Sequence, residues 1–234
     1  MMEIGPKTAL QHLIDRIKRV QLFDEVAVAT TVHPRDSVIV ELCQKLRVPV
    51  HRGSEEDVLG RYVEAAEWFH AGTVFRATSD EPFKDPEVIQ QVLETHLKSG
   101  SDYTCNNLIQ TFPDGCTVEI VNVDALEKAD RLGKQSADRE HVTFYIRQRP
   151  TEFKICNVEA QGKLRRPELR YCLDTEQDLR VVRTIFDHLG GKEPYFTIAE
   201  VINFLDEHQN KIIQNLEEED HGRREIFKRD QNVF

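Results

Sequence analysis

Two acidic residues occupy positions where a pair of carboxylates can hold a metal ion. Asp80 follows the predicted strand 73–77 by three residues, and Asp174 directly follows the predicted strand 171–173. Ligands of an open parallel sheet bind at the carboxyl ends of its strands, so we expect both side chains in one crevice. Carboxylate oxygens, retained waters and a bound polyphosphate make up the octahedron that Mg²⁺ prefers. The placement of Asp80 and Asp174 therefore makes them candidates for a magnesium site.

Each of these residues also has a plainer structural explanation. Asp174 precedes the predicted helix that opens at Thr175, so it can be the N-cap of that helix. Asp80 stands two residues before Pro82, where an aspartate often forms a turn. Asp80 is the better site candidate, because polar loops after buried strands are where functional residues concentrate. For Asp174 the cap is the more common outcome when only the residues are considered.

The elements that must position these residues alternate between strand and helix over roughly the first hundred residues. Asp85 and Pro86 mark a helix start, and Gly100 marks a helix end. The predicted helices span 8–20, 38–46, 58–69 and 86–98, and the predicted strands span 25–30, 49–51 and 73–77. This alternation predicts parallel strands joined by right-handed crossovers. The expected fold class is α/β, with a mostly parallel sheet and helices on both faces.

The pattern changes after Tyr103. A turn signal at 112–115 separates two strands. Here the predicted strands span 103–107, 117–122, 154–158 and 171–173, and the predicted helices span 123–131, 139–149, 175–189 and 198–208. We expect one α/β domain over 1–209, followed by a charged, solvated C-terminal tail over 210–234.

Composition limits the class of protein. The 234 residues are enough for one large core, and the formal charge of −10 disfavours a nucleic-acid partner. The five cysteines are scattered, which argues against a disulfide framework or a zinc site. No apolar run approaches the length that spans a bilayer. We therefore expect a cytoplasmic protein with no membrane or nucleic-acid partner.

Five stretches, in consistent order, resemble the CTP-dependent sugar nucleotidyltransferases. They are GSEEDVLGRY (53–62), RATSDEPFKDP (76–86), FPDGCTVE (112–119), REHVT (139–143) and LDTEQDL (173–179). The resemblance covers roughly residues 2–205 and is greatest to the spore-coat polysaccharide subgroup, which is related to CMP-sialate and CMP-ketodeoxyoctonate synthetases. It implies a nucleotide-diphospho-sugar transferase-like fold. It also implies a cytidylyltransferase that activates a sugar acid or surface-polysaccharide sugar with CTP and releases pyrophosphate.

The resemblance also implies roles for particular residues. Asp80 and Asp174 would hold Mg²⁺. For Asp174 the resemblance therefore favours a role as metal ligand over a role as helix cap. Arg61 and Arg76 would face phosphate or nucleotide. A homodimer is one assembly open to such a chain. Four residues would lie on the sugar side, namely Asp114, Glu119, Glu140 and His141.

The sequence departs from the family pattern at its start. Family members open with a strand and a loop rich in Gly, Ser, Arg and Lys that cradles the triphosphate. Residues 1–7 match only the connection that follows this loop, and Gly5 and Lys7 do not replace it. We therefore expect the fold to lack its usual first strand, which normally lies mid-sheet. Truncation and true loss of the loop both account for this, and in either case weak or undetectable CTP binding is expected.

Two other functions stay open. A family member with impaired catalysis would act as a subunit or scaffold, and the missing phosphate loop favours this. A glycosyltransferase with a nucleotide-sugar donor would have a similar sheet. It would be expected to carry an Asp-x-Asp metal motif after a strand, and the sequence contains none.

Overall fold

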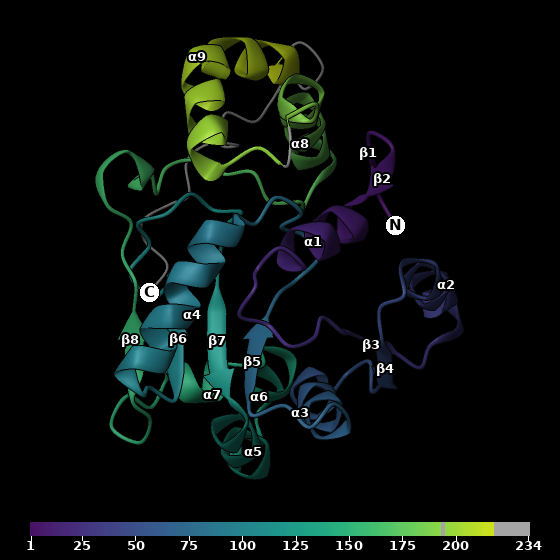
Figure 1. Cartoon of the computed structure of the whole chain (residues 1–234), viewed down its shortest axis with the longest axis vertical. Coiled ribbons are helices and arrows are strands. Elements are labelled where there is room, and N and C mark those ends of the chain that lie inside the picture. Colours follow the sequence, from purple (N-terminus) through teal and green to yellow (C-terminus); the bar gives the residue numbers. More distant parts are fainter. Residues whose placement is uncertain (193–194, 218–234) are drawn as a thin grey trace.

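The computed structural model describes residues 1–192 and 195–217, which form an α/β fold (Figure 1). The helices are α1 (Ala9–Ile17), α2 (Ser37–Leu46), α3 (Val58–Trp68), α4 (Pro86–Ser99), α5 (Val123–Leu132), α6 (Ser136–Glu140), α7 (Phe144–Arg147), α8 (Glu176–Leu189) and α9 (Ile198–Glu217). The strands are β1 (Glu3–Ile4), β2 (Lys7–Thr8), β3 (Val28–Thr31), β4 (Val50–Gly53), β5 (Thr73–Arg76), β6 (Tyr103–Cys105), β7 (Glu119–Asn122) and β8 (Ile155–Asn157). Within these residues, none of the helices combines the length and apolar character needed to cross a bilayer.

The main sheet has four strands in the order β5-β7-β6-β8. Strand β7 is antiparallel to both of its neighbours, whereas β6 and β8 are parallel. The expected α/β class is confirmed, and β7 makes the sheet mixed. Because β7 reverses direction between β5 and β6, the strands β5, β6 and β8 all point the same way. Their carboxyl ends therefore share one edge of the sheet, called here the carboxyl edge.

The register of the sheet aligns four residues across this edge. Arg76 of β5 pairs with Glu119 of β7, and Glu119 in turn pairs with Cys105 of β6. Cys105 pairs with Asn157 of β8. A single row of residues thus crosses all four strands where β5, β6 and β8 end.

Helices cover both faces of this sheet, as the sequence predicted. Ile120 packs in the core cluster that includes Val88 and Val92 of α4, and α4 contacts β6 and β7. The neighbouring Val121 packs on the other face, in a cluster with residues of α3, α5 and α7. This alternation along β7 is expected for a strand that is buried on both faces.

Helix α4 shows why the local sequence gives these boundaries. Asp85 is its N-cap and accepts a hydrogen bond from the backbone N–H of Glu87 at 2.8 Å. Pro86 follows at the first helical position, and Gly100 ends the helix in the left-handed conformation with φ of 59°. Both ends agree with the prediction, because each boundary is set by a residue whose backbone preference is local.

Strands β3 and β4 form a separate parallel pair. In the part of the chain that the structure describes, β3 pairs only with β4 and β5 pairs only with β7. No described strand joins the β3–β4 pair to the main sheet. This division is what the predicted lack of a mid-sheet strand leads one to expect.

Three predictions about elements need correction, and one small hairpin was not predicted. Residues 171–173 form no strand, although the Tyr171 N–H donates to the Asp114 carbonyl at 2.8 Å. The helix expected over 139–149 is split into α6 and α7, because the backbone leaves the helical conformation at His141. The hairpin of β1 and β2 was not predicted, being only two residues per strand. Helix α9 extends beyond 208 to Glu217, and the rest of the predicted tail, 218–234, lies outside the described residues.

Candidate active site

Arg76 is the last residue of β5 and makes a buried ion pair at the carboxyl edge. Its Nη1 donates to Oε2 of Glu119, the residue beside it in the sheet. Glu119 Oε1 also accepts hydrogen bonds at 2.6 Å from the hydroxyl of Tyr103 and from that of Thr143. Burial raises the pKa of the Glu119 carboxyl, but the charge of Arg76 and these hydrogen bonds outweigh it, and the net pKa is lowered. Glu119 is therefore an anion that holds Arg76 in place.

Three predicted site residues have a buried polar atom without a hydrogen-bond partner. The atoms are Oδ1 of Asp80 and the Nε atoms of Arg61 and Arg76. A buried polar group left unpaired costs about 1–3 kcal/mol, so native proteins rarely keep one without a reason. One unpaired acceptor and two cationic donors thus occur among the residues that the resemblance assigned to metal and phosphate.

Arg61 reaches the site from helix α3. Its Nη1 donates to the carbonyl of Ser54, which orients the guanidinium over the turn before the helix. The neighbouring Tyr62 connects α3 to the chain after β5, since its hydroxyl lies 3.4 Å from the carbonyl of Ala77. Helix α3 and the loop that carries Asp80 are thereby tied together.

The backbone segment that precedes Asp174 is hydrogen-bonded to Asp80. The N–H of Leu173 donates to the carbonyl of Asp80 at 2.8 Å, so the two predicted metal ligands come from chain segments in direct contact. The N-cap of α8 is Thr175, whose hydroxyl accepts from the N–H of Asp178. The alternative explanation of Asp174 as the cap of this helix is therefore wrong. Its side chain is 58% exposed and pairs with Arg170 through Oδ2.

Arg170 joins three carboxylates in this region. It contacts Asp114 Oδ2 at 2.7 Å and Asp178 Oδ2 at 3.1 Å, and it pairs with Asp174. Asp178 also accepts from the backbone N–H groups of Asp174 and Thr175, each at 2.9 Å. The predicted residues Asp114 and Asp174 are thus brought together by an arginine that sequence analysis had not selected.

Glu140 and His141 lie at the end of α6, and both are exposed. The ring of His141 lies 6.3 Å from that of Phe144. Thr143, two residues further on, is the member of this segment that reaches Glu119. The structure therefore places Glu140 and His141 on the surface beside the site, whereas Glu119 is only 2% exposed.

Sequence analysis also missed Lys84, which is 1% exposed. Its Nζ contacts Oε2 of Glu81 and the carbonyl of Thr117, while Oε1 of Glu81 accepts from the Thr117 N–H at 3.3 Å. Burial lowers the pKa of Lys84 to about 8. Lys84 and Glu81 thus contact both the carbonyl and the backbone N–H of Thr117. These contacts fix the loop after β5 to the segment before β7. The sequence signal that could have revealed this contact is the pair of opposite charges, Glu81 and Lys84, three positions apart.

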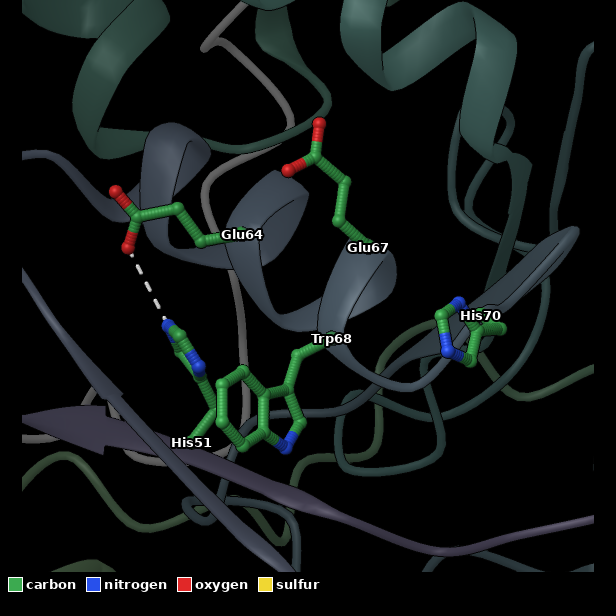
Figure 2. A pocket seen from close by; sticks show the side chains of 5 residues that line it. All are labelled: His51, Glu64, Glu67, Trp68 and His70. Carbon is green, nitrogen blue, oxygen red and sulfur yellow. Dashed lines mark hydrogen bonds and ion pairs between the residues drawn. The ribbon is translucent and has the colours of Figure 1, made fainter.

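A hollow of about 580 Å³ lies elsewhere, between β4 and the last turns of α3 (Figure 2). Its lining residues are His51, Glu64, Glu67, Trp68 and His70. His51 Nε2 lies 3.3 Å from Glu64 Oε2, and Glu67 and His70 lie apart from that pair in Figure 2. Since Trp68 ends α3 and His70 precedes β5, the hollow lies toward the amino ends of the strands. Sheets of this type bind their ligands at the opposite edge.

The donor set at the carboxyl edge suits a hard cation. Asp80 offers a buried carboxylate oxygen with no other partner, and such oxygens are what Mg²⁺ prefers. Among the described residues, no group of three or more His, Cys, Asp or Glu side chains is placed to hold a metal by itself. Mg²⁺ is typically bound by one or two carboxylates together with substrate phosphates, and the unpaired oxygen of Asp80 suits such a role.

The chain matches known proteins over most of its length. A family model described as cytidylyltransferase matches residues 1–225. The spore coat polysaccharide biosynthesis protein SpsF of Bacillus subtilis is 31% identical over 207 residues, which cover 86% of this chain and 85% of that protein.

Solved structures agree with these matches. A cytidylyltransferase from Leptospira borgpetersenii superposes with a TM-score of 0.84 and 25% identity, over 92% of this chain and 89% of that one. The CMP:2-keto-3-deoxy-manno-octonic acid synthetase, solved with CTP, has a TM-score of 0.58 and 16% identity, over 80% of this chain and 90% of that one. The second likeness shows a shared fold.

Proposed function

Because the chain belongs to the cytidylyltransferase family, we propose that it transfers a cytidylyl group from CTP to a sugar acid or a surface-polysaccharide sugar. An oxygen of the sugar forms a bond to the α-phosphorus of CTP, the bond from that phosphorus to the bridging oxygen breaks, and pyrophosphate leaves. The coarser assignment, a nucleotidyltransferase, follows from the family. The nucleotide and the class of sugar are the proposed part.

One observation carries the proposal at the level of residues. The unpaired donors of Arg61 and Arg76 and the unpaired acceptor of Asp80 belong to elements joined at one edge of the sheet. A polyphosphate with its cation would satisfy all three, since its oxygens accept from guanidinium groups and its cation takes a carboxylate oxygen.

Mg²⁺ would be held by Asp80 and Asp174, and when bound it neutralises charge on the phosphates. Arg61 and Arg76 donate hydrogen bonds to phosphate oxygens and stabilise the negative charge that moves toward the leaving pyrophosphate. Glu119 keeps the Arg76 guanidinium in its orientation, so less reorganisation is needed when the substrate binds. Little covalent chemistry is required of the protein, as in other phosphoryl-transfer sites.

The sugar would lie on the side of Asp114, Glu140 and His141. Arg170 joins Asp114 to Asp174, so this side is connected to the proposed metal position. Glu119 would act here indirectly, through Arg76 and Thr143.

The test is pyrophosphate release with Mg²⁺ and each of the four nucleoside triphosphates, against 2-keto-3-deoxy-manno-octonic acid, sialic acid and neutral hexoses. For a form of the protein that includes the family's phosphate loop, the expected result is release with CTP and at least one sugar, together with a CMP-sugar product. Release with another triphosphate in place of CTP would overturn the choice of nucleotide. Transfer from a nucleotide-sugar, with no pyrophosphate formed, would favour the glycosyltransferase. CTP binding without turnover by any sugar would favour the impaired subunit.

A further inference from the structure

Asn157, the last residue of β8, has a side-chain amide whose orientation is fixed. Its Oδ1 accepts hydrogen bonds from the backbone N–H groups of Leu108 at 3.0 Å and Ile109 at 3.3 Å. Two N–H donors require an oxygen, so the amide cannot be flipped. Its Nδ2 then points elsewhere, and this donor is buried with no partner.

Asn107 supplies a matching acceptor. Its Oδ1 is also buried without a partner. Asn107 stands directly before Leu108, in the turn that Asn157 holds against the end of β8. Of the six buried unpaired side-chain atoms in the described residues, three are those of Arg61, Arg76 and Asp80, two are this amide pair, and the sixth is the Tyr171 hydroxyl in the core.

The amide pair lies on the same carboxyl edge as the proposed phosphate site. Asn157 is aligned with Arg76 through Cys105 and Glu119, and two strands lie between the ends of β8 and β5. At about 4.8 Å per strand, the two ends of this row are roughly 14 Å apart. The two amides therefore lie along the same edge as the proposed phosphate site, at the opposite end of the row from Arg76.

We propose that Asn107 and Asn157 form a subsite for a hydroxyl group of the acceptor sugar. A hydroxyl both donates and accepts, so one such group satisfies Asn107 Oδ1 and Asn157 Nδ2 together. A phosphate oxygen is only an acceptor at neutral pH and would leave Asn107 unpaired. The ligand class is therefore a polyhydroxylated acceptor and not the nucleotide. This inference rests on the proposed function and gives the sugar side two residues that had no assigned role.

The test uses Asn157→Asp, which keeps an oxygen for the Leu108 and Ile109 N–H groups and replaces the free donor by a second, negatively charged oxygen. A rise of about 10-fold in KM for the sugar is expected, the effect of one lost hydrogen bond with a partner left unpaired, while KM for CTP changes by less than about 2-fold. Asn107→Leu, which removes the acceptor, should act in the same direction. Asn203→Asp on the exposed face of α9 is the matched control for the added charge. Equal effects on both KM values, or none, would overturn the subsite and indicate that an ordered water satisfies the two amides.

A second measurement separates failure of the subsite from failure of the proposed function. The side-chain amide signal of Asn157 in a ¹⁵N–¹H spectrum is identified by its loss in Asn157→Asp. Titration of the wild-type protein with the same sugars should shift this signal saturably, whether or not pyrophosphate is released. A saturable shift without turnover would leave the subsite standing and refute the activity. No shift with any sugar would refute the subsite, even if CTP is turned over.

Discussion

Asp80 keeps one carboxylate oxygen in the protein interior without a hydrogen bond. Such an atom costs free energy unless a water or a ligand pairs with it, and this cost motivates the proposal that Asp80 contacts a bound cation. The same reasoning applies to the Nε atoms of Arg61 and Arg76. The large hollow beside Trp68 contains no such atom among the described residues. The proposed site therefore rests on the unpaired buried groups and not on this hollow.

The first prediction concerns the charge of Asp80. In a form of the protein that includes the family's phosphate loop, Asp80→Asn should leave the fold intact and lower Mg²⁺-dependent pyrophosphate release by at least about 100-fold, because an amide keeps the shape but loses the charge that holds a hard cation. The measurements are initial rates over a range of Mg²⁺ concentrations and a circular dichroism melt. Asp187→Asn, at an exposed position of α8, is the control for loss of one carboxylate. Wild-type turnover in Asp80→Asn would show that the metal lies elsewhere.

The second prediction concerns the ion pair of Glu119 and Arg76. Glu119→Gln should destabilise the protein by about 3–5 kcal/mol, because it leaves the guanidinium of Arg76 largely buried without a counter-charge. Urea unfolding measures this loss. Combining it with Arg76→Met should restore much of the stability but no activity, since the proposed phosphate contact is then absent. If the single variant is as stable as the wild type, Glu119 does not carry the charge assigned to it.

At the scale of elements, the loop after β5 is fixed by the Glu81–Lys84 pair and not by regular structure. The pair forms hydrogen bonds with the N–H and the carbonyl of Thr117, so the position of the loop depends on a segment more than thirty residues away. Regular elements could not have revealed this contact. It keeps Asp80 within reach of the chain at Leu173.

The third prediction tests this pair. Lys84→Met should cost about 3–5 kcal/mol, because Glu81 stays buried without its partner. The double variant Glu81→Gln/Lys84→Met should recover most of that loss, since the new amide oxygen at position 81 can still accept from the Thr117 N–H. The exposed pair of Glu94 and Lys98 is the control, and Lys98→Met should leave the unfolding midpoint nearly unchanged. Losses that simply add in the double variant would show that the two side chains do not act together.

The fourth prediction is the pH dependence that this lysine imparts. Burial lowers the pKa of Lys84 to about 8 from an ordinary value of 10.5. Between these two values the unfolded chain binds the proton and the folded chain does not, so raising the pH increases the contribution of Lys84 to stability. Denaturant midpoints of the wild type should therefore rise, relative to those of the double variant, from pH 8 to about 10.5. A constant difference across this range would contradict the assignment.

The sequence predicted some of these elements well for a physical reason. Helix α4 was correct at both ends because Asp85, Pro86 and Gly100 act through their own backbone geometry. The strand predicted over 171–173 was wrong because that segment pairs with single residues, Asp114 and Asp80, from two distant parts of the chain. Local patterns carry no information about such partners.

The site shows the same limit. The acidic pair of Asp80 and Asp174 could be named from their places after predicted strands, and the structure brings their segments together. Lys84, Arg170 and Asn157 could not be named, because each gains its importance from partners that only folding brings near. Spacing alone does not distinguish these residues from others of the same type.

At the scale of the whole molecule, buried carboxylates paired with arginine set the response to acid. Burial raises the pKa of Glu119 and of Asp178, but Arg76 and Arg170 respectively outweigh it, so both values are lowered. A carboxyl group with a lowered folded pKa contributes stability that is complete above its unfolded pKa. That contribution disappears as the pH falls through the folded value.

The fifth prediction follows from this. The melting temperature should be nearly constant from pH 7 to about 5 and should fall increasingly below about pH 4, where carboxyl groups of unfolded chains take up protons. Calorimetry across this range measures it. Glu119→Gln should show a shallower decrease than the wild type, because one of the titrating groups is gone. An equal slope in both proteins would exclude Glu119 as a source of acid sensitivity.

The position of β7 between β5 and β6 also affects how the protein can be made. Both neighbours are synthesised before β7, yet neither pairs with the other, and Glu119 comes 43 residues after Arg76 in the chain. Until β7 leaves the ribosome, two apolar strands have their shared partner missing, and Arg76 lacks its counter-charge. Pairings over such distances form slowly and leave hydrophobic surface open to aggregation. Nascent chains that stall between β6 and β7 are therefore expected to depend most on chaperones, and a pause after β7 has left the ribosome would be tolerated far better.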